Sequence, residues 1–509
     1  MTMNRRNFIA AATAGTLSAT VSGAYAVELS ALKNPKWNEE ADVVVVGFGG
    51  AGACAAIEAH DAGAKVLMLE KTAEGGGNTS VSAGGIMIPK NKADAYVYLE
   101  KTYDFAKSDK DVELLKIFCD EIVQQRDFLL GLGKDAKMGR YGGAGHKLPH
   151  ADTIDKYTFF YNGASAGPAL FALYKNAVMN QRKIPVFFET AGKRLIVDKG
   201  VVIGIEAEGK SGKLLIRAKR AVVLATGGYE YNSEMLKNFS KATEVHALGC
   251  PANTGDGILM AQSVGAKLWH MTSYSCPLGA VVPGKTALAS SGMPKSGIWV
   301  DKYGKRFTNE KGIDTHTCIY AVDILDPVKH EYPRIPCFLI FDEKGRKEGP
   351  CAGSITGWIG YREGYKWSKD NSVEIKQGII KKADTLEELA KLSGIDPKGL
   401  SDGVKAWNES VKAGADKAFG RDPAKSAAID EGPFYALPLY PSLLNTQGGP
   451  RKNQHGQVLD VFDKPIPHLY AAGEMGSMWG SIYQGACNNA ESLVFGRLAG
   501  RAAAAEKPI

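Results

Sequence analysis

The chain contains 509 residues, of which 44% are hydrophobic and 23% are charged. This balance is typical of a globular protein and excludes a disordered chain, and the length predicts more than one domain, because single cores stop growing at roughly 250–300 residues. The net charge of +7 forms no basic stripe interleaved with aromatic residues, so we expect no nucleic-acid partner.

The N-terminus has the pattern of an export signal. Arg5 and Arg6 precede a modest apolar run, and Ala24-Tyr25-Ala26 offers small residues at both positions that determine cleavage. The pattern predicts a twin-arginine signal peptide over residues 1–26 and a periplasmic mature protein; a chance arginine pair in a cytosolic protein is the alternative. No segment has the roughly 20 apolar residues of a transmembrane helix, so we expect no membrane span.

A pattern typical of dinucleotide binding follows. A run of β-branched residues over 41–46 predicts a strand buried on both faces, and Gly47-Phe48-Gly49-Gly50-Ala51-Gly52 follows it directly. A predicted helix over 53–62 leads to a second predicted strand over 64–69, which ends at Glu70. In such units the helix N-terminus binds a pyrophosphate and the acid binds ribose hydroxyls.

A second glycine-rich stretch carries a resemblance to a known family. Residues 75–85 read GGGNTSVSAGG, which is similar to the segment that wraps FAD in the flavoprotein family of fumarate reductases, succinate dehydrogenases and 3-ketosteroid dehydrogenases. Membrane-bound respiratory members carry the flavin covalently on a histidine near this segment. This chain has Asn78 there, with no histidine between His60 and His146, so the resemblance implies FAD bound without a covalent link.

The resemblance extends along nearly the whole mature chain. It covers the stretches 221–229 (AVVLATGGY), 253–257 (NTGDG, before a predicted helix over 258–264), 469–474 (LYAAGE) and 495–500 (FGRLAG). In the family these segments return to the FAD, and the last helix directs its positive N-terminus at the isoalloxazine. The resemblance implies FAD binding by Gly47, Gly49, Gly50, Ala51, Gly52, Glu70, Lys71, Gly77, Asn78, Thr79, Ser80, Gly84, Gly85, Ala225, Thr226, Gly227, Asn253, Asp256, Gly473, Glu474, Asn489, Ser492 and Leu493.

The pattern changes over residues 270–440. Residues 298–310 predict a strand, a turn and a polar continuation, and 335–342 predict another strand. Asp384 is expected to cap a helix that ends near Gly394, and residues 401–414 predict a further helix. This segment resembles the family's capping domain. The fold class is therefore α/β, with a Rossmann-like FAD-binding domain (27–269 and 441–509) and an inserted α+β capping domain (270–440).

Two candidates for proton transfer follow the GKRFTNE motif over 304–310. Fumarate reductases place a catalytic arginine four residues after its glutamate, and ketosteroid dehydrogenases carry tyrosine there. This chain has Asp314, which cannot clamp a substrate carboxylate because like charges repel strongly in a dry site. A buried Asp314 could shuttle a proton, and His316 is an alternative for that role. Both residues could instead be loop residues that face water.

Three further positions distinguish this chain within the family. Tyr483 stands where fumarate reductases bind substrate with arginine, and its Tyr-x-Gly-Ala setting resembles ketosteroid dehydrogenases, in which the hydroxyl holds a ketone. Asn445 replaces a substrate-contacting histidine, whereas His270 matches one. A packing role for Tyr483 and a structural role for His270 are the alternatives. Most of the dicarboxylate-binding set is thus missing.

These observations predict an exported FAD-dependent oxidoreductase that reduces an activated C=C bond of a small organic molecule other than fumarate. The eight cysteines form neither CxxC nor CxxCH, so we expect buried thiols, no metal or haem in the chain, and an external cytochrome c or quinol-linked donor. One alternative is a ketosteroid dehydrogenase-like desaturase of a cyclic ketone. Another is a non-catalytic flavin electron-transfer subunit.

Overall fold

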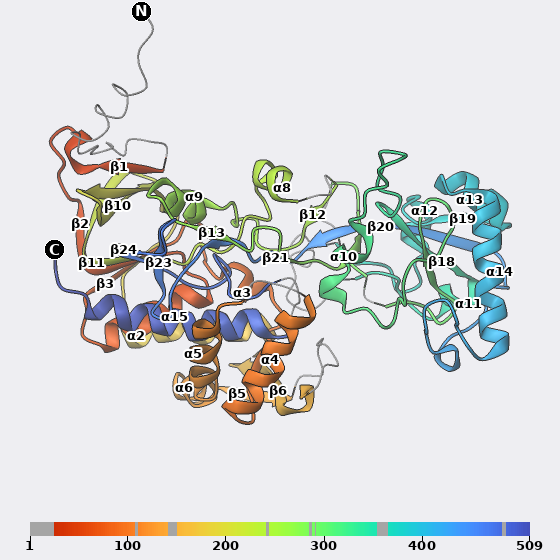
Figure 1. Cartoon of the computed structure of the whole chain (residues 1–509), viewed down its shortest axis with the longest axis horizontal. Coiled ribbons are helices and arrows are strands. Elements are labelled where there is room, and N and C mark those ends of the chain that lie inside the picture. The colour runs from red at the N-terminus through yellow and green to blue at the C-terminus, as the bar shows by residue number, and fades with distance from the viewer. Residues whose placement is uncertain are drawn as a thin grey trace, which may run out of the picture.

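The computed structural model describes residues 25–106, 110–140, 150–240, 244–284, 288–290, 292–353, 365–480 and 485–509. Most of the predicted signal peptide (1–24) and the predicted catalytic Tyr483 lie outside these ranges. The described chain forms two bodies, one around a nine-stranded sheet and one around a seven-stranded sheet, and Figure 1 shows them side by side along the long axis.

The first body is built on the nine-stranded sheet. Its strands run in the order β1 (Ala26–Glu28), β9 (Ala191–Asp198), β10 (Val201–Gly209), β11 (Gly212–Leu224), β2 (Glu39–Val46), β3 (Val66–Leu69) and β8 (Val186–Phe187), while β24 (Pro465–Ala471) pairs with β11 and with β23 (Gln457–Leu459). The valines of β2 are buried on both faces, and β2 pairs in parallel with β11 and β3. The strand predicted over 41–46 is therefore confirmed as a central strand of a parallel unit.

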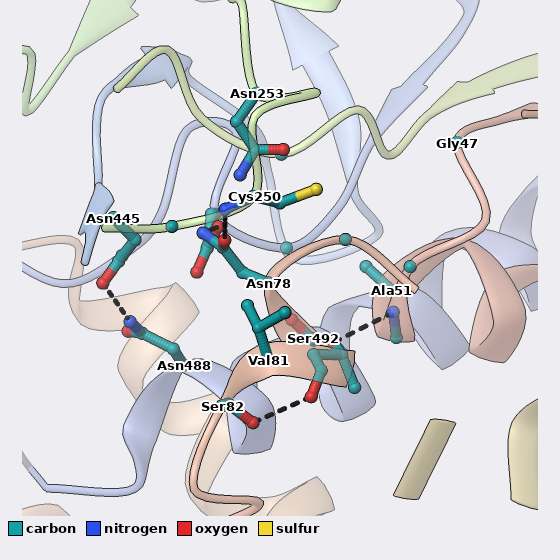
Figure 2. A pocket seen from close by; sticks show the side chains of 18 of the residues that line it. Gly47, Ala51, Asn78, Val81, Ser82, Cys250, Asn253, Asn445, Asn488 and Ser492 are labelled. Atoms are coloured by element: carbon teal, nitrogen blue, oxygen red, sulfur yellow. Dashed lines mark hydrogen bonds between the residues drawn. The ribbon is translucent and has the colours of Figure 1, made fainter. Parts of the chain in front are cut away.

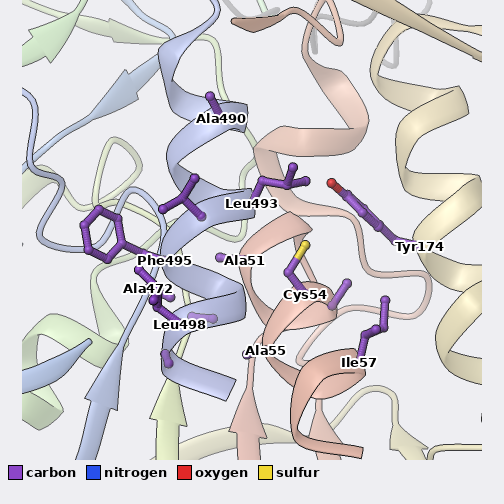
Figure 3. Close-up of a cluster of buried hydrophobic side chains, with 14 of the residues drawn as sticks. Ala51, Cys54, Ala55, Ile57, Tyr174, Ala472, Ala490, Leu493, Phe495 and Leu498 are labelled. Atoms are coloured by element: carbon purple, nitrogen blue, oxygen red, sulfur yellow. The ribbon is translucent and has the colours of Figure 1, made fainter. Parts of the chain in front are cut away.

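Two helices from opposite ends of the chain pack together on this sheet. They are α2 (Gly50–Asp61) and α15 (Cys487–Ala505), and Figure 3 shows their small and apolar side chains interlocked. A Cβ on Gly496 would come within 2.6 Å of the carbonyl oxygen of Ala51, and one on Gly500 would overlap that of Ala55. The two backbones thus touch, and this contact holds the N-terminus of α15 beside the first glycine turn.

A smaller layer completes the first body beside α15. It contains a four-stranded sheet of β4 (Ile86–Pro89), β6 (Ile154–Tyr161), β5 (Lys137–Arg140) and β7 (Ala164–Ser165). Its helices are α3 (Gly77–Val81), α4 (Lys92–Ala106), α5 (Val112–Ile122), α6 (Gln125–Gly131) and α7 (Ala166–Lys175), the last continued by a π-helical turn at Asn176–Gln181. Asp111 caps α5 by accepting hydrogen bonds from the backbone of Glu113 and Leu114.

The second body is built on the seven-stranded sheet. Its strands run in the order β16 (Leu288–Ala289), β15 (Leu278–Ala280), β20 (Phe434–Leu443), β18 (Cys337–Asp342) and β17 (Ile298–Val300), and β12 (His246–Ala247) and β19 (Lys381–Ala383) also pair with β20. Its helices are α10 (Ile319–Val322), α11 (Glu343–Lys347), α12 (Ser372–Lys376), α13 (Leu386–Ser393) and α14 (Pro397–Ala413).

Short elements connect the bodies and flank the site. Two antiparallel pairs, β13 (Leu268–Trp269) with β22 (Gly449–Pro450) and β14 (Tyr274–Ser275) with β21 (Asn445–Thr446), lie where the chain passes between the bodies. Helices α8 (Ser233–Phe239) and α9 (Asp256–Ser263) stand near them. Single 3-10 turns occur at Leu29–Ala31, Ala151–Thr153, Thr315–Thr317 and Pro423–Lys425.

The predicted helices of the second body are confirmed with one correction. Asp384 does not cap α13. The cap is Thr385, whose hydroxyl accepts a hydrogen bond from the backbone of Glu388 at 3.2 Å. The helix ends at Gly394 with a left-handed φ of 71°, as expected. Helix α14 begins at Pro397, earlier than predicted, because Asp396 caps it.

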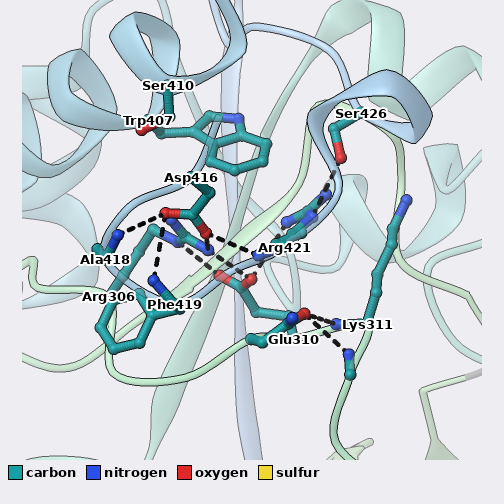
Figure 4. Close-up of polar contacts among 12 residues, drawn as sticks. Arg306, Glu310, Lys311, Trp407, Ser410, Asp416, Ala418, Phe419, Arg421 and Ser426 are labelled. Carbon is teal, nitrogen blue, oxygen red and sulfur yellow. Dashed lines mark hydrogen bonds and ion pairs between the residues drawn. The ribbon is translucent and has the colours of Figure 1, made fainter. Parts of the chain in front are cut away.

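The GKRFTNE motif over residues 304–310 stabilises the second body. Figure 4 shows the guanidinium groups of Arg306 and Arg421 around the carboxylate of Glu310, with Asp416 as a second acid. The side chains of Glu310 and Asp416 are fully buried, and Arg421 is only 1% exposed. The guanidinium of Arg421 also lies 4.4 Å from the centre of a Trp407 ring. This network ties the motif to α14 and to the segment after it.

Two general expectations are met by the described chain. All eight cysteines fall within it, all are buried, and they form no disulfide. Among the helices of the described ranges, none combines the length and the apolar character needed to cross a membrane.

Candidate functional site

An elongated cavity lies at the carboxyl ends of the parallel strands. Its wall includes Val46, Leu69, Ala225 and Ala472, each of which ends or directly follows a strand of the nine-stranded sheet. The empty space between the lining residues is about 1740 Å³, counted out to open solvent, which admits a ligand as long as a dinucleotide. Figure 2 shows the cavity with residues from both termini of the chain around it.

The first glycine turn fits a phosphate group. Gly47 has a φ of 103°, and a Cβ there would overlap the carbonyl oxygen of Ala225. Gly49 precedes α2 without offering a side chain, and Gly49, Gly50 and Ala51 line the cavity at the N-terminus of this helix, where the Gly50 amide donates to Thr79 Oγ1 at 3.1 Å. Unpaired amides and the positive end of the helix dipole bind an anion. The geometry therefore fits the pyrophosphate of FAD, as the sequence predicted.

Glu70 is buried beside this turn and lines the cavity. Its Oε2 accepts a hydrogen bond from the backbone of Phe48 at 2.9 Å, and its Oε1 accepts bonds from the backbone and hydroxyl of Thr72, both at 2.7 Å. The carboxylate thus fixes the glycine turn from the wall of the cavity. This position fits the predicted contact with a ribose.

Lys71 and Asp256 both line the cavity and are paired with each other. The Nζ of Lys71 lies 2.7 Å from Asp256 Oδ2 and 2.7 Å from Thr254 Oγ1. The pair joins the end of β3 to the start of α9. We call it the Lys71–Asp256 clasp.

We predict that Asp256→Asn raises the rate of FAD release by no more than about fivefold. The clasp side chains are 28% and 35% exposed, and such ion pairs contribute roughly 0–1 kcal/mol. The measurement is the recovery of flavin fluorescence after dilution of the holoprotein. A hundredfold faster release would show that the clasp holds the cofactor directly.

An amide bridges the cavity-lining carboxyl group of Glu474 to the carboxyl group of Glu230, which is buried behind the wall. Asn78 Nδ2 donates to Glu230 Oε1 at 2.9 Å and to Glu474 Oε2 at 2.8 Å, and Asn253 Nδ2 donates to the same Glu230 oxygen at 2.7 Å. Burial raises the pKa of Glu230, and burial together with the charge of Glu230 raises the pKa of Glu474. The sequence interpretation missed Glu230. Its only signal was an acid placed shortly after the Thr226-Gly227-Gly228 turn.

A chain of amide side chains lies at the α15 end of the cavity. Gln447 Nε2 donates to Asn488 Oδ1 at 3.2 Å, and Asn488 Nδ2 donates to Asn445 Oδ1 at 3.0 Å; Figure 2 shows the second of these bonds. The Asn445 oxygen accepts from Asn488, and Asn445 Nδ2 donates to the carbonyl oxygen of Thr446 at 3.4 Å, which leaves the second N–H of this amide as a donor. Asn445 and Asn488 both line the cavity, so a neutral donor is presented there.

His316 lines the cavity, whereas Asp314 lies behind it and contacts the His316 ring. Thr315 and His316 line the cavity, but Asp314 does not. Asp314 Oδ1 accepts a hydrogen bond from the backbone of His316 at 2.9 Å and lies 3.1 Å from the ring Nδ1 of the same residue. A carboxylate at Nδ1 orients the imidazole and leaves Nε2 as the reactive nitrogen. Of the two predicted candidates, His316 is thus the one in position to meet a substrate.

His270 lies outside the cavity wall. Its ring Nδ1 is 2.9 Å from the carbonyl oxygen of Ser477, and the ring stacks on Trp269 at 4.2 Å. The structure therefore does not bring His270 to the predicted substrate contact. Tyr483 belongs to the segment 481–484, outside the described residues, and its neighbours Gly485 and Ala486 line the cavity.

The predicted FAD-binding residues are brought together with few exceptions. Gly52, Ser80, Gly84 and Leu493 do not line the cavity. Gly52 packs against the carbonyl of Gly47, Gly84 packs against Ala166, and Leu493 is buried in the core beside α2. Those that do line it are Gly47, Gly49, Gly50, Ala51, Glu70, Lys71, Gly77, Asn78, Thr79, Gly85, Ala225, Thr226, Gly227, Asn253, Asp256, Gly473, Glu474, Asn489 and Ser492.

Comparison with known proteins gives a consistent result. The model of the family described as "FAD binding domain" matches residues 42–490. The chain is 32% identical over 481 residues to a fumarate reductase (cytochrome) of Shewanella frigidimarina, covering 92% of this chain and 77% of the relative. It is 28% identical over 580 residues to a 3-oxosteroid 1-dehydrogenase of Mycolicibacterium smegmatis, covering 91% and 96%. The fold is that of the 3-ketosteroid Δ1-dehydrogenase from Sterolibacterium denitrificans, with a TM-score of 0.79, 23% identity and coverage of 92% and 100%.

Proposed function

We propose that this chain reduces an activated C=C bond conjugated to an uncharged carbonyl group. The premise is that the chain belongs to the family of the FAD binding domain and is an FAD-dependent oxidoreductase acting on C=C bonds. One observation carries the choice of substrate. The described wall of the cavity presents the imidazole of His316 and the amide of Asn445, and its one Lys or Arg side chain, Lys71, is held by Asp256. Such a wall favours a neutral polar group over a dicarboxylate.

The bound FAD supplies the hydride in this chemistry. The residues of the chain do the remaining work. The Asn445 amide donates a hydrogen bond to the substrate carbonyl, where negative charge develops. His316, oriented by Asp314, delivers the proton to the carbon next to that carbonyl. The N-terminus of α15, whose residues Ala486, Asn488 and Asn489 line the cavity, adds a positive potential.

The same groups would serve the reverse reaction, the desaturation of a cyclic ketone. In that direction His316 accepts the proton and Asn445 holds the ketone. The neutral amide chain and the Tyr-x-Gly-Ala sequence at Tyr483 favour this second candidate, and a relative that shares 28% of its residues is a 3-oxosteroid 1-dehydrogenase. A substrate assay in both directions decides between the two.

We further propose that the protein is periplasmic, takes electrons from an external cytochrome c or quinol-linked donor, and holds FAD without a covalent bond. The Arg5-Arg6 leader supports export. The amide of Asn78 is engaged by two carboxyl groups and offers no nucleophile to the flavin. Acid precipitation tests the last point, because a covalent flavin would remain yellow in the pellet.

A substrate panel tests the proposed reaction. The holoenzyme is reduced anaerobically with a viologen dye and mixed with enones, cinnamates, fumarate or 3-ketosteroids. We expect a neutral enone to reoxidise the flavin faster than its carboxylate analogue. Fast turnover of fumarate would contradict the proposal.

We predict that His316→Gln lowers kcat for the best substrate at least tenfold, about 1.4 kcal/mol. Glutamine retains a polar side chain but cannot transfer the proton. Tyr483→Phe should lower kcat by a similar factor, because it removes the hydroxyl that we expect to hold the substrate carbonyl. Steady-state kinetics with matched FAD content is the measurement, and the control is His270→Gln, because His270 lies off the cavity wall. Near-normal rates for His316→Gln would remove it from catalysis.

A further inference from the structure

Glu230 and Glu474 form an acidic pair, and no Lys or Arg side chain of the described ranges makes an ion pair with either. Each accepts a hydrogen bond from the single amide nitrogen of Asn78. Glu230 is 1% exposed, and Glu474 is half-buried with the rest of its surface open to the cavity. Two carboxylates this close cannot both stay ionised in a desolvated site without a cation, so such pairs hold a proton.

The second oxygen of Glu230 gives independent support. Among the described residues, Glu230 Oε2 is buried and has no hydrogen-bond partner of good geometry, although the backbone amides of Glu230 and Thr446 lie close enough to the carboxyl group to oppose the rise of its pKa. A buried ionised oxygen without a partner is costly, whereas a protonated carboxyl needs fewer donors. The position is also crowded, because a Cβ on Gly228 would lie 2.7 Å from this oxygen.

The surroundings supply little other charge. Glu491 faces Glu474 but is paired with the buried Lys452 at 3.2 Å. Tyr229 and Cys250 flank the pair, with the backbone of Cys250 donating to Asn78. Along the cavity wall the remaining charged groups are Glu70 and the Lys71–Asp256 clasp, and His316 is the other group there that can titrate.

We propose that Glu230 and Glu474 act as a proton-holding pair that takes up one proton from water when the bound FAD is reduced. Reduction of the bound FAD by two electrons, supplied by an electrode in the test below, would add negative charge to the cavity. One proton from bulk water then moves through the cavity to the Glu474 side of the pair, where it forms an O–H bond and neutralises a carboxylate. The pair thus balances the charge that a fixed cation would otherwise balance. This inference rests on bound FAD alone and not on the reaction proposed above.

The test is the pH dependence of the flavin midpoint potential, measured by spectroelectrochemistry on the holoprotein. One additional proton per two electrons steepens the slope by about 30 mV per pH unit. Wild type should show this additional slope between pH 6 and 8, and the double variant Glu230→Gln/Glu474→Gln should lack it. Glu230→Gln keeps the acceptor oxygen for Asn78 and Asn253 and places its amide at the oxygen that has no partner, so its fold should persist. Glu206→Gln, a carboxylate held by Arg194 and Lys213 away from the cavity, is the matched control.

A second readout needs no variant. Redox-difference infrared spectra of wild type should show a protonated carboxylic acid signal that grows on flavin reduction and shifts in D₂O. Equal potential slopes in wild type and the double variant, or no carboxylic acid signal in wild type, would overturn the proposal. Neither measurement involves substrate turnover. The proton-holding pair can therefore be confirmed or refuted whether or not the enzyme reduces an alkene.

Discussion

Gly52→Ala is expected to lower the affinity for FAD at least 100-fold, equivalent to about 2.8 kcal/mol. Gly52 lies in the first turn of α2, and a Cβ there would overlap the carbonyl oxygen of Gly47 and lie 3.1 Å from its carbonyl carbon. These are backbone atoms of the turn that fits the pyrophosphate, so they cannot rotate away as a side chain can. The turn must shift, and its amides then lose their alignment with the phosphates.

The measurement is titration of the apoprotein with FAD, followed by flavin fluorescence. Gly131→Ala is the matched control, because Gly131 also lies in a helix, α6, and a Cβ there meets nothing within 4 Å. That variant should bind FAD normally, since alanine favours a helix over glycine. Normal affinity in Gly52→Ala would mean that the glycine turn is not the phosphate site.

Glu310→Ala is expected to lower the free energy of unfolding of the second body by about 3–5 kcal/mol. Glu310 accepts hydrogen bonds from Arg306 at 2.8 Å and from Arg421 at 3.3 Å, and all three side chains are at most 7% exposed. Removing the acid leaves two buried guanidinium groups to share Asp416, which contacts Arg306. The loss of stability comes mainly from the buried positive charge that is left without a carboxylate partner.

Urea unfolding followed by tryptophan fluorescence measures this loss, because Trp407 stacks on both arginines. Glu387→Ala in the same body is the control. Glu387 pairs with Lys391 one helical turn away on the surface, with side chains 70% and 64% exposed, so solvent screens the pair and its loss should leave the free energy of unfolding nearly unchanged. Equal stability of the two variants would show that the buried network contributes no more than a surface pair.

Local elements were predictable because short stretches of sequence encode them. The strand, glycine turn and helix over residues 39–61 follow from β-branched residues and from glycines that allow close backbone contacts. The end of α13 at Gly394 follows from glycine in a left-handed conformation. The start of that helix was misplaced by one residue, because Asp384 and Thr385 are both good caps and only the backbone geometry selects Thr385.

The site required contacts that sequence spacing does not reveal. Asp314 and His316 were equivalent candidates in the sequence, and the turn at Thr315–Thr317 directs His316 to the cavity and Asp314 to its ring nitrogen. Glu230 was missed because its local signal, an acid shortly after a glycine turn, does not reveal its partners. Its importance comes from its contacts with residues far away in the sequence. Asn78, which joins the two acids, lies 152 positions from Glu230 and 396 positions from Glu474.

The sequence by itself determined the α/β class, the glycine turn and the identity of the cofactor, because these depend on backbone conformations set within a few tens of residues. Only the tertiary structure decided which polar side chains share the cavity wall. That choice depends on how α15 packs against α2 and on how the second body meets the first. Burial and electrostatic coupling arise between segments that become neighbours only after folding.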